Sequence, residues 1–194
     1  MKFEDVVKFH RHTCPGLALG YRVAVTALEE LGLKEPPTDE EIVCIVENDS
    51  CAVDAIQVVT GCTFGKGNLI FKDYGKQVYT FFNRKTAKTL RISIDFEFKE
   101  TEKEKKLWQR FVEGDNSSEV IEFIKKRKAE KIKQILNAKI EEILKITYPE
   151  IKPPKRARIF KSLRCANCGE KVAEAKARLL NGKILCIPCF EASL

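Results

Sequence analysis

The sequence predicts an α+β fold in which helices pack on a mixed or antiparallel sheet, followed by a long helix and a small cysteine-rich module. Helix-like and strand-like patterns alternate in the first hundred residues, charged helices follow, and two Cys-x-x-Cys pairs lie near the end. With 194 residues, 44% of them hydrophobic, the chain is long enough for one ordinary core and an accessory module.

The helices of the first part are expected at residues 3–9, 15–31, 51–60 and 101–112. Pro15 suits a first helical turn, and Gly32 is a natural stop for the second of these helices. Short β-branched or aromatic runs predict the strands, at residues 42–46, 69–72, 77–82 and 90–98. Turn-forming residues at 73–76 and 83–86 predict two hairpins between the last three strands.

After Gly114 the pattern predicts one helix up to about Ile146, with an isoleucine and leucine stripe along one side. Such a helix would be about 45 Å long, too long to bury on a small sheet. We therefore expect it to meet a second copy of the chain, giving a homodimer, or to reach the last segment.

We expect three regions: an α+β domain with its long helix at 1–148, a basic proline-containing linker at 149–162, and a cysteine module at 163–194. Residues 151–194 hold ten Lys and Arg against three Asp and Glu, which accounts for the whole formal net charge of +7. The basic tract Lys152–Arg158 could contact phosphates, although no recognition helix or aromatic platform favours nucleic acid.

Two cysteine pairs in the last region have the spacing of a tetrahedral zinc site. They are Cys165 with Cys168 and Cys186 with Cys189. Four thiolates leave no open position on the metal, so the site is interpreted as structural. Asn181-Gly182 predicts a hairpin between the two pairs. The Ile-Pro-x-Cys pattern resembles the zinc ribbons of the DksA/TraR type.

A second cluster of metal-ligand residues lies near the N-terminus, where both histidines of the chain, His10 and His12, are followed by Cys14. Cys51 at a helix start and Cys62 in a glycine-rich loop complete a candidate site for zinc or another soft transition metal. Cys44 is interpreted as a buried apolar residue within a strand.

Three motifs resemble the formylmethanofuran dehydrogenase E-subunit family over about residues 5–145. They are His10-x-His12-x-Cys14-Pro-Gly with Gly20-Tyr-Arg22, then Cys51-Ala-Val-Asp54-Ala-Ile-Gln57, then Thr60-Gly-Cys62-Thr-x-Gly65-Lys66-Gly-Asn68-Leu. The resemblance implies an α+β fold, a dimer, an archaeal methanogenesis context and association with a molybdenum or tungsten enzyme.

At the matched positions, Cys14, Cys51 and Asp54 are the catalytic candidates. Asp54 would orient an imidazole or act as a base. Arg22, Gln57 and Lys66 are the candidates for holding a small anionic or pterin-like ligand of one-carbon metabolism. The alternative for Asp54 and Gln57 is an ordinary helix cap or polar pair, and for Arg22 a surface ion pair.

Two other functions stay open. One is a non-catalytic accessory or regulatory protein whose ribbon docks on an enzyme or on nucleic acid. The other is a thiol redox protein using Cys14 with Cys51 or Cys62, which the lack of a Cys-x-x-Cys pair in that region disfavours. No apolar run reaches the roughly 20 residues needed to span a bilayer, so we expect a cytoplasmic protein with reduced cysteines.

Overall fold

The computed structural model describes residues 1–194, which form two compact units, Met1–Arg156 and Ala157–Leu194. The boundary lies within the segment 149–162 that we expected to be a linker. The beginning of that segment belongs to the first unit, because the Arg84 guanidinium donates a hydrogen bond to the Pro154 carbonyl at 2.6 Å. None of the helices combines the length and the apolar character that crossing a membrane requires.

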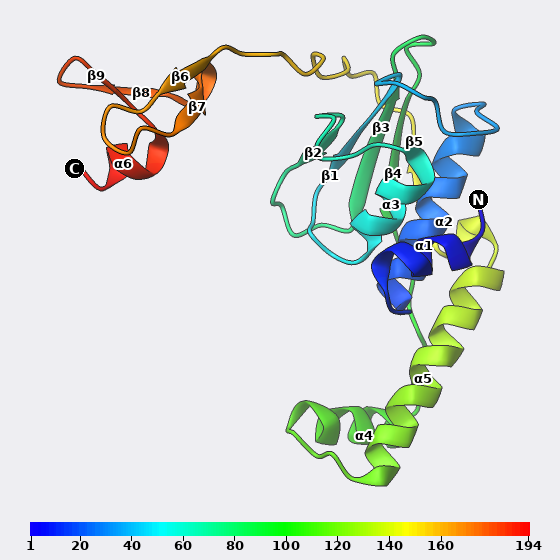
Figure 1. The fold of residues 1–194 in the computed structure, drawn as a ribbon. Coiled ribbons are helices and arrows are strands. Elements are labelled where there is room, and N and C mark those ends of the chain that lie inside the picture. The colour runs from blue at the N-terminus through cyan, green and yellow to red at the C-terminus, as the bar shows by residue number, and fades with distance from the viewer. The chain divides into compact units, whose positions relative to one another are not determined.

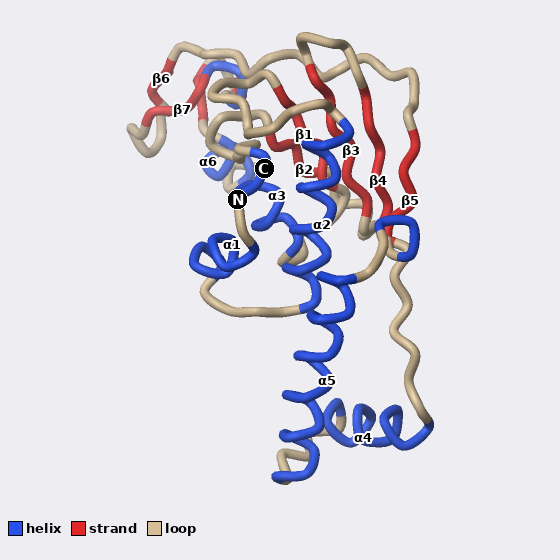
Figure 2. The backbone as a smooth tube through the Cα atoms, turned by 90° about the vertical axis from the view of Figure 1, so that its right-hand side faces the viewer, coloured by secondary structure: helices blue, strands red, loops and turns tan.

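A five-stranded mixed sheet lies at the centre of the first unit (Figures 1 and 2), with the strand order β2-β1-β3-β4-β5. β1 pairs in parallel with β2, and every other pair is antiparallel. The α+β class predicted from the sequence is therefore confirmed. The strands are β1 (Ile42–Val46), β2 (Leu69–Phe71), β3 (Val78–Asn83), β4 (Thr89–Ile94) and β5 (Leu144–Thr147).

The order of the strands differs from the predicted meander. β1 lies between β2 and β3, so residues 73–76 connect two strands that are not neighbours, and the hairpin predicted there is wrong. Four of the five β1 residues are buried, and a strand of this kind belongs in the middle of a sheet. The hairpin predicted at 83–86 is confirmed: it joins β3 to β4, and the Asn83 side chain accepts hydrogen bonds from the next residues.

Five helices belong to the first unit, and α2 and α3 cover one face of the sheet (Figure 2). The core lies between these two helices and the sheet, with Leu17, Ile56 and Phe81 fully buried. The helices are α1 (Phe3–His10), α2 (Pro15–Glu30), α3 (Ala52–Thr60), α4 (Glu102–Val112) and α5 (Ser118–Asn137).

The long helix predicted up to Ile146 ends at Asn137, so that prediction is wrong in its second half. The chain continues through a 3₁₀ turn (Ile140–Glu142) into β5. Ile143 and Leu144 are buried in the core, where they complete the sheet beside β4. The apolar residues that extended the helical pattern therefore serve the sheet instead, a case of tertiary packing overriding a local preference.

Helices α4 and α5 form a hairpin that extends away from the sheet (Figures 1 and 2). Thr101 caps α4 in a capping box with Glu104, as the local sequence Thr-x-x-Glu favours. Of the 20 residues of α5, only Val120, Arg127 and Ile135 are buried. Much of this hairpin is therefore accessible to a ligand or a partner.

The second unit consists of two hairpins and a short helix. The second hairpin turns at Asn181 and Gly182, which both have positive φ angles, 50° and 75°, as an Asn-Gly turn requires. The hairpin predicted there is confirmed. The elements are β6 (Ser162–Arg164), β7 (Lys171–Ala173), a 3₁₀ turn (Glu174–Lys176), β8 (Arg178–Leu180), β9 (Lys183–Leu185) and α6 (Ile187–Glu191).

Candidate metal centre

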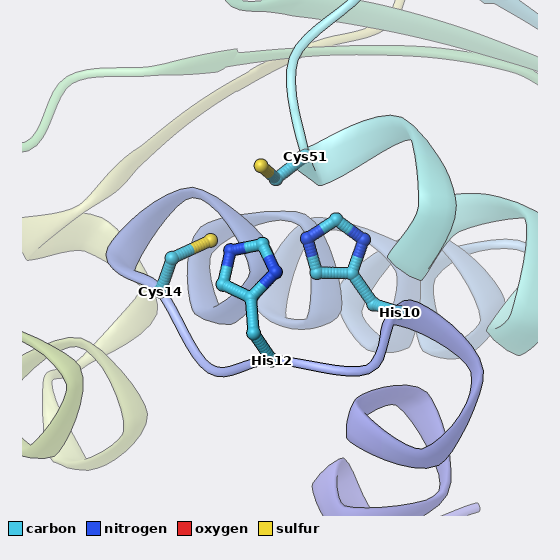
Figure 3. Close-up of side chains that lie close together, drawn as sticks. All are labelled: His10, His12, Cys14 and Cys51. Carbon is cyan, nitrogen blue, oxygen red and sulfur yellow. The ribbon is translucent and has the colours of Figure 1, made fainter.

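The N-terminal cluster is assembled where three helices meet (Figure 3). His10 is the last residue of α1, Cys14 is the N-cap of α2, and Cys51 is the N-cap of α3, with His12 in the connection between the first two. One potential ligand atom from each of the four residues lies within 4.8 Å of all the others. Ligand atoms in a tetrahedral zinc site lie about 3.3–3.8 Å apart, so small side-chain adjustments suffice to bind the ion.

Gly20 brings the two cysteine-bearing helices together. A Cβ atom at this position would lie 2.3 Å from the carbonyl oxygen of Ala52, so only glycine allows α2 to pack this closely on α3. Gly16 lies one turn before it, close to the Cys51 side chain. The glycines of the Cys14–Gly20 segment therefore determine the distance between Cys14 and Cys51.

His10 is held in an orientation that suits a metal ligand. Its Nδ1 lies 2.7 Å from Oδ2 of Asp54, and its side chain is 11% exposed. A carboxylate partner favours a proton on Nδ1, which leaves Nε2 as a lone-pair donor. Nε2 is buried and has no hydrogen-bond partner. An unpaired buried nitrogen is costly, and a bound metal ion would satisfy it.

Asp54 therefore has the first of the two roles predicted for it, the orientation of an imidazole. Its second oxygen accepts a weak hydrogen bond from Gln57 at 3.4 Å, and the Gln57 carbonyl oxygen accepts one from the Phe64 amide at 3.5 Å. Gln57 thus supports Asp54 and connects it to the loop after α3. This contact is the polar pair that we considered as the alternative to ligand binding.

The cysteines of the cluster are neighbours in chemistry as well as in space. Burial raises the pKa of the Cys51 thiol, and the nearby Cys14 thiol raises it further. The Cys14 sulfur accepts a hydrogen bond from the Leu17 amide at 3.3 Å, so the thiol also caps α2. A metal ion binding here has to displace protons from these thiols.

Cys62 does not belong to the cluster, which corrects the ligand set expected from the sequence. It is fully buried beneath the sheet residues, and its thiol donates a hydrogen bond to the Ile42 carbonyl at 3.6 Å. Burial raises its pKa to about 11. Cys44 is buried as predicted, and burial raises its pKa well above the ordinary value. Both thiols are apolar core groups.

Arg22 is likewise not available for a ligand. Its guanidinium donates to the carbonyls of Ile135, Leu136 and Ala138 at 2.7, 2.8 and 2.7 Å. These are carbonyls at the C-terminal end of α5, which otherwise lack partners. Arg22 therefore fastens α5 to α2. Lys66, on the loop after α3, is half-buried and its charge acts on Cys62 rather than on the cluster.

The second cluster lies in the second unit and contains the four cysteines predicted for zinc. Their sulfur atoms lie within 4.8 Å of one another, and those of Cys168 and Cys186 are 3.8 Å apart, the spacing of two thiolates on one zinc ion. Hydrogen bonds from the backbone amides of Cys168 and Cys186 lower the pKa of Cys165 to about 6. All four positions of a tetrahedral ion would be filled by the protein.

A cavity beside the N-terminal cluster involves residues that sequence reasoning did not single out. It has a volume of about 330 Å³ and lies between the start of α2 and the α4–α5 hairpin. The signal that could have identified it is the combination of the single tryptophan, Trp108, with the cationic stretch that begins at Lys125. The lining residues are Cys14, Pro15, Trp108, Phe111, Ile124, Arg127, Lys128 and Lys131.

Comparisons with known proteins agree with this geometry. Residues 9–145 match the family described as FmdE, Molybdenum formylmethanofuran dehydrogenase operon, and residues 158–193 match the prokaryotic DksA/TraR C4-type zinc finger. A solved structure from Syntrophus aciditrophicus, described as an FmdE-like protein of a tungsten formylmethanofuran dehydrogenase, has a TM-score of 0.60 and 24% identity. The alignment covers 98% of this chain and 90% of that one, so the two share a fold.

A curated relative from Archaeoglobus fulgidus is 34% identical over 189 residues and is described as a probable S-adenosyl-L-methionine-binding protein. The match covers 94% of this chain and 50% of the relative, so the chain spans about half of that protein's length. The family resemblance inferred from the motifs is confirmed. The chain belongs to the FmdE family and carries a DksA/TraR-type zinc finger in its C-terminal unit.

Proposed function

We propose that this protein binds a transition metal, most simply Zn²⁺, at His10, His12, Cys14 and Cys51, and that this centre acts on or senses a small ligand. The observation that carries the proposal is the buried Nε2 of His10, which has no partner while Asp54 holds the opposite nitrogen. Two imidazoles and two thiolates form a mixed shell that suits zinc and other soft transition metals.

The two metal sites would have different roles. In the ribbon the four thiolates of Cys165, Cys168, Cys186 and Cys189 would enclose a structural zinc ion. In the N-terminal cluster His12 is exposed and the two cysteines are half-buried, so solvent can reach the centre. A metal there would supply a Lewis acid, and Cys14 and Cys51 would be its thiolate ligands beside the cavity.

The ligand we propose is the one that the family relationship favours: a small anionic or pterin-like molecule of one-carbon metabolism. The family description refers to a molybdenum formylmethanofuran dehydrogenase operon. Free thiols at all eight cysteines fit a reducing compartment, and we place the protein in the cytoplasm.

Metal analysis of cysteine variants tests the first part of the proposal. We expect about two zinc ions per chain in the purified protein and about one in the Cys165→Ser/Cys168→Ser double variant. Adding Cys51→Ala to that variant should remove the remaining ion, whereas adding Cys62→Ala, the matched thiol outside the cluster, should retain it. A double variant without metal would contradict the N-terminal centre and favour a thiol redox pair of Cys14 with Cys51.

The second candidate function is that of an accessory protein whose ribbon docks on a partner. It is favoured by Leu179 and Ile184, which are opposite one another on β8 and β9 and are 71% and 37% exposed. An exposed apolar pair beside basic residues suits a protein partner, such as a molybdenum or tungsten enzyme, better than nucleic acid. Truncation after Pro149 should abolish such binding, and salt-dependent nucleic-acid binding that survives truncation would contradict a role of the ribbon.

We also propose that the chain forms a homodimer through α5. The helix extends beyond the sheet and buries only three of its residues within the chain. Its half-buried Ile121 and Ile132 offer an apolar stripe to a second copy. Sedimentation equilibrium should give twice the chain mass, and Ile121→Glu/Ile132→Glu should shift the protein to monomer. A monomeric parent protein would contradict the proposal.

A further inference from the structure

The cavity between α2, α4 and α5 has the composition of a binding site for a ring-containing anion. Cys14 belongs both to this cavity and to the N-terminal cluster, so a molecule in the cavity would lie next to the metal of the proposed centre. A volume of about 330 Å³ is at the lower end of those of small-molecule sites.

The walls of the cavity are apolar and partly aromatic. Pro15, Phe111 and Ile124 contribute apolar surface, and the Trp108 ring lies 5.7 Å from that of Phe111. Trp108 remains 39% exposed, which is unusual for the only tryptophan of a chain with a well-formed core. A flat conjugated ring would cover this surface.

The rim of the cavity is cationic. Arg127, Lys128 and Lys131 line it, and the only carboxylate paired with any of them is Glu100, which contacts Arg127 and lies 3.6 Å from Lys131. Lys128 has no carboxylate partner. The charge at the rim is therefore positive after pairing, which favours an anionic ligand.

Arg127 adds a separate sign of an incomplete site. It is only 8% exposed, its guanidinium lies over the Trp108 ring at 4.4 Å, and its Nε has no hydrogen-bond partner. A buried guanidinium nitrogen without a partner is costly, and an anionic oxygen within the cavity could satisfy it. An adjoining groove of about 580 Å³ shares Lys128 and adds Lys125 and Lys133, so the cationic surface continues along α5.

We propose that this cavity binds a flat conjugated ring that carries an anionic group. The ring lies against Trp108, Phe111 and Pro15, and the anionic group lies at Lys128 and Arg127. The proposal rests on the function proposed above, to which it adds the binding residues and the charge of the ligand. It also replaces Arg22, Gln57 and Lys66, which the sequence indicated, with residues of the α4–α5 hairpin.

Isothermal titration calorimetry of the full chain with matched probes tests the proposal. The probes are 1-naphthalenesulfonate, the neutral 1-naphthalenemethanol and sulfate. We expect the sulfonate to bind about tenfold more tightly than either of the others, because a charge-assisted contact and ring burial act together. Equal affinity for the neutral ring, or for sulfate alone, would overturn the proposal.

Two lysines on α5 provide a matched pair of variants. Lys128→Gln should weaken binding of the sulfonate by about tenfold, whereas Lys126→Gln, two residues away on an exposed side and outside both cavities, should leave it unchanged. Equal losses in both variants would show only a general charge effect and would contradict the site.

Trp108 gives a position-specific readout, since a chain with one tryptophan has a single indole N–H resonance. Titration of the sulfonate should shift this resonance in the parent protein and much less in Lys128→Gln. Binding that leaves the resonance unchanged, including the case in which a second copy covers the cavity, would overturn the proposal. Zinc content measured on the same samples tests the metal centre separately, so failure of one proposal is distinguishable from failure of the other.

S-adenosyl-L-methionine is a useful fourth probe, because it is named in the description of the Archaeoglobus relative. It has a flat adenine ring, but its sulfonium and ammonium groups outweigh its single carboxylate. The cationic rim should therefore bind it more weakly than the sulfonate. Tighter binding, with a shift of the Trp108 resonance, would contradict the inferred charge of the ligand.

Discussion

The two clusters of metal-ligand residues contain four ligands each but differ in what brings them together. The ribbon cysteines lie on two short hairpins within a unit of 38 residues that buries few side chains. The N-terminal cluster draws on three helices that are already fixed by the core of the larger unit. We infer from this difference that metal holds the ribbon in its fold, whereas the N-terminal centre is a site built on a fold that exists without metal.

Removal of the ribbon metal should have the largest effect. Zinc contributes about 10–16 kcal/mol to the folding of comparable zinc-finger peptides, so the Cys165→Ser/Cys168→Ser variant should lose the structure of residues 157–194. The unit at 1–156 should keep its fold, which NMR spectra and limited proteolysis can show. A ribbon that stays folded without metal would break the comparison.

Gly20→Ala should come next, because it changes the packing of the two helices that hold Cys14 and Cys51. The added methyl group would lie 2.3 Å from the Ala52 carbonyl oxygen, and overpacking of this kind costs about 1–3 kcal/mol. We expect a lower midpoint in denaturant and weaker metal binding at the N-terminal centre. Gly65→Ala is the control, since a Cβ at that position would have no neighbour within 4 Å. Equal effects of the two changes would contradict the role of Gly20.

Asp54→Asn should separate metal affinity from stability. The carboxylate is the partner of His10 Nδ1, and loss of such a partner lowers metal affinity by about 10–100-fold. Competition with a chelator of known zinc affinity measures the change, and the ribbon site serves as an internal reference. The exposed Asp39 provides the matched control through Asp39→Asn. Unchanged affinity in Asp54→Asn would show that His10 does not need this support.

A pH titration should give the smallest and most graded difference between the sites. The pKa of Cys51 is raised by burial, so this thiol is more fully protonated near neutral pH and a metal must displace its proton. The pKa of Cys165 is lowered to about 6, so that thiol is mostly ionised at pH 7. N-terminal affinity should therefore fall with decreasing pH throughout the range below the raised Cys51 pKa, by up to about tenfold per unit for each proton displaced. Ribbon binding should lose the Cys165 contribution only as the pH approaches 6. Metal release in the opposite order would contradict this assignment.

The sequence by itself determined the features that local chemistry controls. The ribbon follows from two Cys-x-x-Cys pairs and an Asn-Gly turn, whose left-handed backbone is a property of the turn itself. Pro15 begins α2, Thr101 caps α4, and the β-branched run at 42–46 forms β1. His10, His12, Cys14 and Cys51 were also predicted together from their types and motifs, and the structure places them in one cluster.

Only the tertiary structure decided which of the candidate residues share a site. Cys62 follows α3 closely in the sequence, yet its side chain points into the core, and Arg22 serves the end of α5, 113 residues away. Residues 143–147 keep an apolar pattern that suits a helix, but β4 offers an edge that they pair with instead. The cavity with Trp108 and Lys128 needs α2, α4 and α5 to meet. Contacts between distant segments depend on the packing of the whole core, and no local pattern in the sequence encodes them.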